Sequence, residues 1–199
     1  KIVFAASNLR QHRFYQILLQ NNKIDKNSLA QIPDFTNDLA LAQILIGKNI
    51  LDKTSADEMF CQQITQIIED ILSWKTGGWS FSHLAQAKDG ICYEINLQLL
   101  LTNYARNMAD DAIISRFKSF DEKFSLIENA AVNFDLLPLE GFILSRMTPS
   151  FVRIEAIKNQ CGLSNIEVLK TLYVLWLGNL ISRKNWNSAF SESQIKDIL

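Results

Sequence analysis

The chain carries one short motif twice: residues 17–29 read ILLQNNKIDKNSL, and residues 44–56 read ILIGKNILDKTSA. The two copies share an Ile-Leu pair, one asparagine, an Asp-Lys pair and one serine at matching positions. Each shared residue has a role in the backbone or in packing, because asparagine tolerates the left-handed conformation that ends a helix and serine caps the next helix. The motif therefore predicts a structural unit that is used twice, rather than a ligand site.

The motif also predicts where the amino-terminal helices begin and end. The first helix is expected to stop at Asn21-Asn22, with Ser28 capping the next helix, and Asn49 and Ser55 are expected to do the same in the second copy. The strongest helical pattern then runs from Ser55 to Trp74, and Ser55-Ala-Asp-Glu58 has the sequence of a capping box. A strand at residues 1–6 and a hairpin between residues 79–81 and 91–95 complete this half.

Composition and charge exclude several classes of function. The 199 residues are 48% hydrophobic, which is ample for a buried core, and the formal charge of −1 gives no overall field toward nucleic acid or a lipid surface. The cysteines, Cys61, Cys92 and Cys161, are odd in number and widely spaced, as is typical of reduced thiols in a cytoplasmic protein. No apolar run has the length of a membrane helix, so we expect neither a membrane span nor a secretory signal.

The carboxyl-terminal half predicts a winged helix-turn-helix. Helices are expected at 97–108 and 112–117, a strand at 124–127, and a boundary near 129–138. Three helices should follow: one at 139–147, one capped by Thr148-Pro149, and one from the capping box Ser164-Asn-Ile-Glu167 to a stop at Gly178-Asn179. A strand at 180–184 comes last. Three helices with a glycine-containing turn before the third, followed by strands, are the plan of that motif.

The expected fold is therefore α+β and predominantly α-helical. A helical amino-terminal domain with short strands should occupy residues 1–128, and a winged-helix-like domain residues 136–199. The opening KIVFAAS is rich in β-formers and has no initiator methionine before it, so we expect a piece of a longer protein whose upstream strands are missing.

Several segments resemble the PATAN domain family of bacterial signalling proteins. The most specific is W-x-x-G-x-W/F-x-F, here residues 74–81, and KIVFAAS, INLQLLLTNYAR and EVLKTLYVLWLGNLISRK occur in the matching order. The resemblance covers most of the chain. It implies a cytoplasmic signal-transduction or scaffold module beside receiver domains, as in two-component systems, that acts through a protein partner or a neighbouring domain of the same chain. It carries over no catalytic residues.

The repeated motif also resembles the amino-terminal domain of type II secretion and pilus ATPases, which binds cyclic di-GMP through tandem Arg-Leu-Gly motifs. Here the first copy reads Arg13-Phe14-Tyr15 and the second Ala40-Leu41-Ala42, so one arginine remains and both glycines are missing. Arg13 is accordingly the one candidate nucleotide-binding residue, and cyclic di-GMP sensing is a third function behind protein interaction and DNA binding.

No set of residues predicts an enzyme, a cofactor or a metal site. His12 and His83 are separated by seventy residues and are expected on the surface or in loops, and no nucleophile motif or phosphate loop occurs. The helix ending at Leu177 is apolar around most of its circumference, which favours contact with protein over DNA reading. The candidate partner-binding residues in this region are Lys170, Trp176, Arg183, Lys184 and Trp186.

Overall fold

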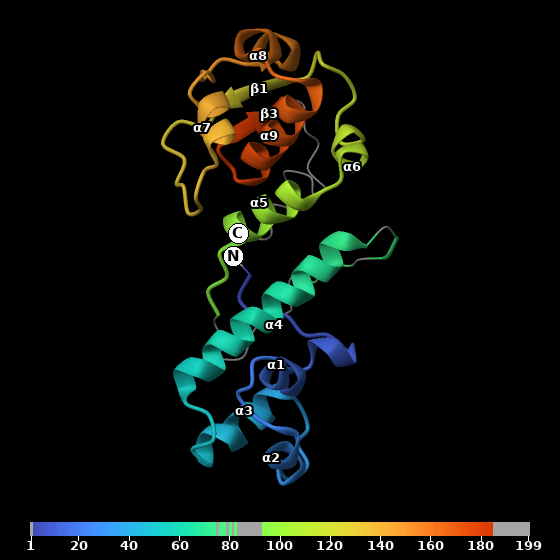
Figure 1. Cartoon of the computed structure of the whole chain (residues 1–199), viewed down its shortest axis with the longest axis vertical. Coiled ribbons are helices and arrows are strands. Elements are labelled where there is room, and N and C mark those ends of the chain that lie inside the picture. Colours follow the sequence, from blue (N-terminus) through green and yellow to red (C-terminus); the bar gives the residue numbers. More distant parts are fainter. Residues whose placement is uncertain (1, 75, 79, 81, 83–92, 185–199) are drawn as a thin grey trace. The chain divides into compact units, whose positions relative to one another are not determined.

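The computed structural model describes residues 2–74, 76–78, 80, 82 and 93–184, and its contacts divide the chain into two compact units, Lys1–Ile95 and Asn96–Leu199 (Figure 1). This division differs from the predicted domains at 1–128 and 136–199. The reason is that helix α5 (Leu97–Asn107) packs along helix α9 (Asn165–Leu177), so the residues after Ile95 belong with the carboxyl-terminal helices.

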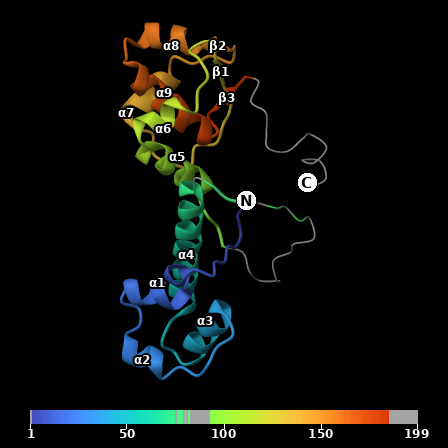
Figure 2. The same ribbon diagram turned by 90° about the vertical axis from the view of Figure 1, so that its right-hand side faces the viewer.

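The amino-terminal unit is helical. It contains the 3₁₀ turn η1 (Arg10–His12) and helices α1 (Phe14–Gln20), α2 (Lys26–Ala30), α3 (Asp38–Gly47) and α4 (Lys53–Ser73). Helices α1 and α3 pack against α4 and against each other (Figure 2). The Phe14 and Phe60 rings stack at 4.1 Å between centroids, and Tyr93 stacks on Phe60 at 5.0 Å. Burial, followed by the nearby Asp57 charge, raises the pKa of Tyr93 to about 12.

The repeated motif forms the same local structure twice, as predicted. Asn22 and Asn49 follow α1 and α3 with φ of 53° and 55°, in the left-handed region that ends a helix. The predicted serine caps are wrong, however. Asp25 caps α2 and Asp52 caps α4, because each carboxylate accepts a hydrogen bond from the backbone N–H of the serine three residues later. Ser55 and Glu58 therefore form no capping box, since the helix begins before them.

Other amino-terminal predictions have mixed outcomes. The long helix is confirmed, with Phe60, Ile64 and Ile67 buried on one face. Residues 2–6 form no strand. Among the described residues, one backbone hydrogen bond reaches this segment from residues 93–95, from Tyr93 N–H to Val3 O. Most of the expected hairpin between 79–81 and 91–95 lies outside the described residues.

The carboxyl-terminal unit is built around α9. Helix α9 packs against α5, α6 (Asp110–Ile114), α7 (Pro138–Leu144) and α8 (Ile154–Cys161), which surround it in Figure 2. The strands β1 (Lys123–Leu126), β2 (Val152–Arg153) and β3 (Ile181–Arg183) form an antiparallel sheet in the order β2-β1-β3. Phe124 of β1 and Ile181 of β3 lie on the sheet face toward this core.

Both ends of α9 follow the prediction. Ser164 and Glu167 form the capping box, and Asn179 ends the helix with φ of 56°. Gly178 stands where a Cβ atom would lie 2.8 Å from the Phe134 ring, so only glycine permits the loop at 129–137 to approach so closely. The side chain of Gln98 on α5 holds the same loop. Its amide donates to Ala131 O and Gly178 O, and its oxygen accepts from Asn133 N.

The predicted α+β, predominantly helical class is confirmed, but a helix start in the carboxyl-terminal unit is also wrong. Thr148 and Pro149 begin no helix, because Val152 and Arg153 pair with β1 and α8 starts only at Ile154. The proline at a helix start is instead Pro138 in α7. The winged-helix arrangement stays a prediction, since residues 185–199, which would contain its wing, lie outside the described residues. None of the described helices is both long and apolar enough to cross a membrane.

We expect Asn49→Ala to lower the free energy of unfolding by about 1 kcal/mol, because alanine is strained at positive φ. Asn49→Gly should change it little, since glycine adopts this conformation freely. Urea unfolding of both variants measures the difference. Asn27→Ala, inside α2, is the matched control, and a loss there equal to that of Asn49→Ala would contradict the assignment.

We also expect the contribution of Asp52 to stability to depend on pH. Hydrogen bonds from the backbone N–H and the hydroxyl of Ser55 hold the pKa of Asp52 below its usual value. Its contribution is therefore present above the unfolded pKa near 4 and is lost as the pH falls through the folded pKa. Asp52→Ala should melt about 4–8 °C below wild type at pH 7, and this gap should narrow toward pH 3. Asp52→Asn, a cap that does not titrate, is the control, and a gap for Asp52→Ala that is constant with pH would refute the prediction.

Candidate functional site

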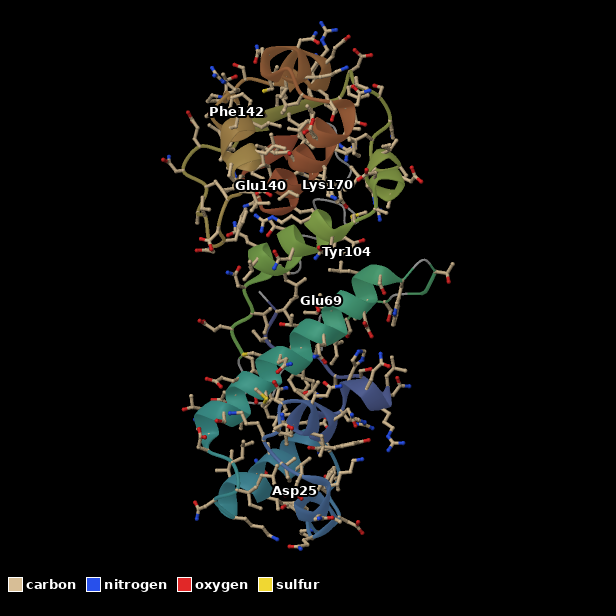
Figure 3. All side chains as sticks on the ribbon, in the orientation of Figure 1. Asp25, Glu69, Tyr104, Glu140, Phe142 and Lys170 are labelled. Carbon is tan, nitrogen blue, oxygen red and sulfur yellow. The ribbon has the colours of Figure 1, made fainter. Side chains whose placement is uncertain are left out.

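A pocket of about 200 Å³ lies between α5, α7 and α9 of the carboxyl-terminal unit. Leu137, Leu139 and Val174 supply apolar walls, and the predicted candidate Lys170 is at its margin. Figure 3 labels Glu140 on α7 and Lys170 on α9, two of the charged residues that line the pocket. The residues that line it are Arg106, Leu137, Leu139, Glu140, Glu167, Lys170, Thr171 and Val174.

Glu140 is a carboxylate that is only 3% exposed, and its place follows from the start of α7. Pro138 opens the helix, so Glu140 falls in its first turn and accepts the Leu137 N–H at 2.9 Å. The same carboxylate accepts two bonds from Arg106, at 2.9 Å from Nε and 2.7 Å from Nη2. These two hydrogen bonds between one guanidinium and one carboxylate join α5 to α7 across the pocket.

The Arg106 guanidinium also bonds to other protein groups. It donates to Asp135 O at 2.7 Å and Asn103 Oδ1 at 3.2 Å, and it lies 5.6 Å from the centre of the Phe134 ring. The hydrogen bond to Glu140 raises the pKa of Arg106. The ion pair therefore closes the pocket with its charges compensated, and it is a poor site for a further ionic ligand.

The polar groups at the margin are satisfied within the protein as well. Lys170 Nζ donates to Met108 O at 3.1 Å and lies 4.0 Å from Asp110 Oδ1. Glu167 accepts from the hydroxyl and N–H of Ser164, and the hydroxyl bond lowers the pKa of Glu167. The pocket thus combines apolar walls with charged groups whose hydrogen bonds are already made, which suits an apolar group from outside.

The structure places Arg183 beneath the surface. It is 9% exposed, its Nε donates to Glu122 Oε2 at 2.7 Å, and its Nη2 donates to Arg116 O at 2.8 Å. Its guanidinium lies 4.9 Å from the centre of the Phe117 ring and 5.3 Å from that of Trp176. Trp176 and Arg183 are therefore brought together, but as an internal cluster that joins α9 and β3 to the loop before β1.

The other predicted site residues are scattered. Lys184 is exposed, with Nζ 5.6 Å from the Phe151 ring centre, and Trp186 lies outside the described residues. Arg13, the candidate for nucleotide binding, is partly buried at the start of α1 in the other unit. Lys170 alone borders the pocket between α5, α7 and α9.

The prediction of a surface or loop position for His12 is wrong, and His83 lies outside the described residues. His12 is 4% exposed, with Nε2 2.7 Å from Asp70 Oδ2 and Nδ1 3.1 Å from Ser7 Oγ. The buried amide of Gln63 donates to His12 O and to Asp38 Oδ2. Ser7 Oγ also accepts a hydrogen bond from Leu9 N–H. This line of side chains links η1 to α4.

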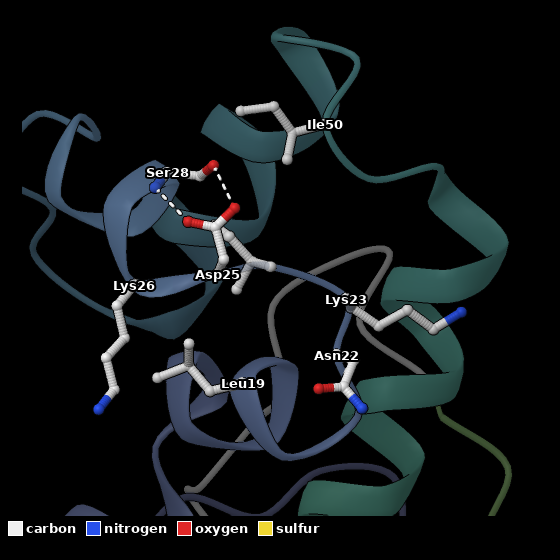
Figure 4. A pocket seen from close by; sticks show the side chains of 8 residues that line it. Leu19, Asn22, Lys23, Asp25, Lys26, Ser28 and Ile50 are labelled. Carbon is white, nitrogen blue, oxygen red and sulfur yellow. Dashed lines mark hydrogen bonds between the residues drawn. The ribbon is translucent and has the colours of Figure 1, made fainter.

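The repeated motif borders a shallow pocket of about 460 Å³ in the amino-terminal unit (Figure 4). Asp25 is its acidic residue, and both of its oxygens accept hydrogen bonds from Ser28, drawn as dashed lines in Figure 4. The backbone bond from Ser28 is the main cause that lowers the pKa of Asp25. The carboxylate is committed to its helix cap, in agreement with the structural interpretation of the motif. Within the described ranges, no three His, Cys, Asp or Glu side chains gather as a metal site would require.

Sequence reasoning missed both members of the Arg106–Glu140 pair. A signal for Glu140 was present, because Leu137-Pro138-Leu-Glu140 places proline first and glutamate third in a helix. No local pattern joins Glu140 to Arg106, which is 34 positions earlier. The same holds for His12 and Asp70, which meet only through the packing of η1 on α4.

We expect Glu140→Ala to lower the free energy of unfolding by about 2–3 kcal/mol, since it leaves a half-buried guanidinium unpaired and uncaps α7. Glu155→Ala, an exposed glutamate of α8, should change it by less than about 0.5 kcal/mol. Chemical unfolding of Glu140→Ala, Arg106→Ala and the double variant tests the pair. Strictly additive losses would mean that the two residues are not coupled.

Comparison with known proteins gives no match to a family model, a curated protein or a solved structure. The resemblance to the PATAN family therefore stays an expectation from the sequence.

Proposed function

We propose that the chain is a non-catalytic interaction module of the bacterial cytoplasm, acting in signal transduction or as a scaffold within a larger multidomain protein. In this proposal the α5–α7–α9 pocket receives an apolar side chain from a protein partner or a neighbouring domain. The observation that carries the proposal is a pocket with apolar walls whose charged residues already bond to other protein groups.

The hydrogen bonding of the pocket favours an apolar occupant. A polar ligand would have to replace the bonds of Glu140, Arg106 or Lys170 with bonds of its own, for little net gain. An apolar side chain covers Leu139 and Val174 without breaking any of them, and each square ångström removed from water contributes about 25 cal/mol. The pocket volume of about 200 Å³ limits the occupant to a small group of this kind.

The margin of the pocket supports recognition of a protein surface. Leu137 is 49% exposed beside the pocket, so it offers an apolar contact that the unit itself leaves open. Lys170 and Glu167 bring charges of opposite sign to the same margin. An apolar centre with a charged rim is the usual composition of a protein interface.

The ionisable groups give little support for catalysis. Burial raises the pKa of the Cys61 and Cys161 thiols, so both are weak nucleophiles at neutral pH. Glu140 is held by three hydrogen bonds, and Asp25 is held by its cap. These groups serve the fold, which favours a binding role over an enzymatic one.

The alternative of DNA reading by the last helix is weaker. Seven of the 13 residues of α9 are buried, including Thr171 and Tyr173, and Lys170 is engaged with Met108 O. A reading helix needs an exposed polar face that fits the major groove. Cyclic di-GMP sensing has less support still, because Arg13 lies partly buried and its counterpart in the second copy is Ala40.

A photo-reactive amino acid tests the proposal when it is placed at Leu137 of the full-length protein in cells. We expect a defined crosslinked partner, or a defined crosslink to a neighbouring domain, and we expect Leu137→Asp to weaken that association about tenfold. Aspartate is a favoured cap, so the start of α7 should be retained in this variant.

Ile114 in α6 supplies the control, because it is 51% exposed and lies outside the pocket. The same photo-reactive group at Ile114 should give no such product, and Ile114→Asp should leave the association intact. Identical crosslinks from both positions, or full association of Leu137→Asp, would refute the proposal.

A further inference from the structure

One row of cross-strand neighbours in the carboxyl-terminal sheet consists of three basic residues. Lys123 of β1 pairs with Arg153 of β2, and on its other side Lys184 N–H donates to Lys123 O at 2.9 Å. Phe124 and Arg183, one position along, are also opposite each other, which places Lys184 directly beside Lys123. Residues that face each other across strands point to the same side of a sheet. Arg153, Lys123 and Lys184 therefore share one face, opposite the face that buries Phe124.

This row is unfavourable for the isolated protein. Like charges directly opposite each other destabilise a sheet, and the row contains two such pairs. Arg153 has a partial counter-charge in Asp121 at 3.6 Å, but both side chains are more than half exposed. Within the described residues, no ion pair forms at Lys123 or Lys184, and Glu155 near the end of β2 is also exposed. A row of cations that lowers the stability of the sheet in this way is typical of a site that binds an anion.

An exposed aromatic ring lies beside this row of cations. Ser125 pairs with Ser182 but is only 5% exposed, and Phe151 immediately precedes β2 in the chain. The Phe151 ring is 44% exposed, and Lys184 Nζ lies 5.6 Å from its centre. We call these four residues the cationic sheet face: Arg153, Lys123, Lys184 and Phe151.

We propose that the cationic sheet face binds single-stranded nucleic acid. The strand spacing of about 4.8 Å spreads the three cations over roughly 10 Å, which suits successive phosphates of an extended backbone better than one compact anion. The exposed Phe151 ring beside Lys184 offers a stacking surface for a base next to its phosphate. A lipid headgroup or a phosphopeptide would use the cations but has no base to stack on this ring. The proposal is independent of the pocket between α5, α7 and α9.

Fluorescence anisotropy with labelled oligothymidylate and oligouridylate of about 12 nucleotides tests the proposal on the whole chain. We expect salt-dependent binding with a slope of log K against log salt near −2, because about three phosphates are neutralised. Lys184→Ala and Lys123→Ala should each weaken binding at low salt and reduce the slope by about 0.7. Phe151→Leu should weaken binding about tenfold, whereas Phe151→Trp should retain it.

Two controls distinguish binding by the cationic sheet face from non-specific attraction between charges and from a loss of stability. Lys48→Ala removes an exposed lysine of the amino-terminal unit and should leave affinity and slope unchanged. Lys184→Ala and Lys123→Ala should melt at or above the wild-type temperature, since like-charge repulsion is relieved. A lower melting temperature in both would assign the row a structural role instead.

Absence of binding to either oligonucleotide at about 20 mM salt would overturn the proposal. An equal loss in Lys48→Ala would do the same, because it would show a general charge effect. A third arm uses vesicles containing phosphatidylserine, and a fourth uses a phosphoserine peptide. Binding there that depends on Lys184 but not on Phe151, together with no oligonucleotide binding, would reassign the face to that ligand.

Discussion

The carboxyl-terminal unit depends on the burial of one helix that is apolar on nearly every side. Because α9 has no broad polar face, it must be covered all round, and α5, α6, α7, α8 and the sheet supply that cover. This requirement places the neighbouring elements and leaves the small pocket where α5 and α7 do not close completely over α9. It also turns the charged residues outward, so that Lys123, Arg153 and Lys184 gather on the far side of the sheet.

The amino-terminal unit depends instead on the residues that end each short helix and begin the next one. Asn22 and Asn49 each reverse the backbone by taking a positive φ, and an aspartate cap follows three residues later. The buried residue between them, Ile24 or Leu51, holds the turn on the core. Polar side chains complete the unit, since Gln63 and the His12–Asp70 pair hold η1 against α4.

The sequence was sufficient to predict helix ends and caps where a single residue determines the local backbone conformation. The asparagine stops, the Ser164–Glu167 box and the long helix α4 could all be predicted because their causes lie within a few positions. Competing local signals were harder to rank: Thr148-Pro149 and Leu137-Pro138 both suggest a helix start, and only strand pairing of Val152 decides between them. The Arg106–Glu140 pair and the basic row across the sheet required the tertiary fold, because their members are distant in sequence.

The side-chain amide of Gln98 links three parts of the carboxyl-terminal unit that are distant from one another in the sequence. It bonds to Ala131, Asn133 and Gly178, so the first turn of α5, the end of α9 and the loop before α7 are held as one rigid corner. Leu137 lies at the far end of that loop, beside the pocket. The loop that leads to Leu137 is thus hydrogen-bonded to the opening turn of α5, which immediately follows the amino-terminal unit in the chain. A pull on the chain at that junction would act first on this corner.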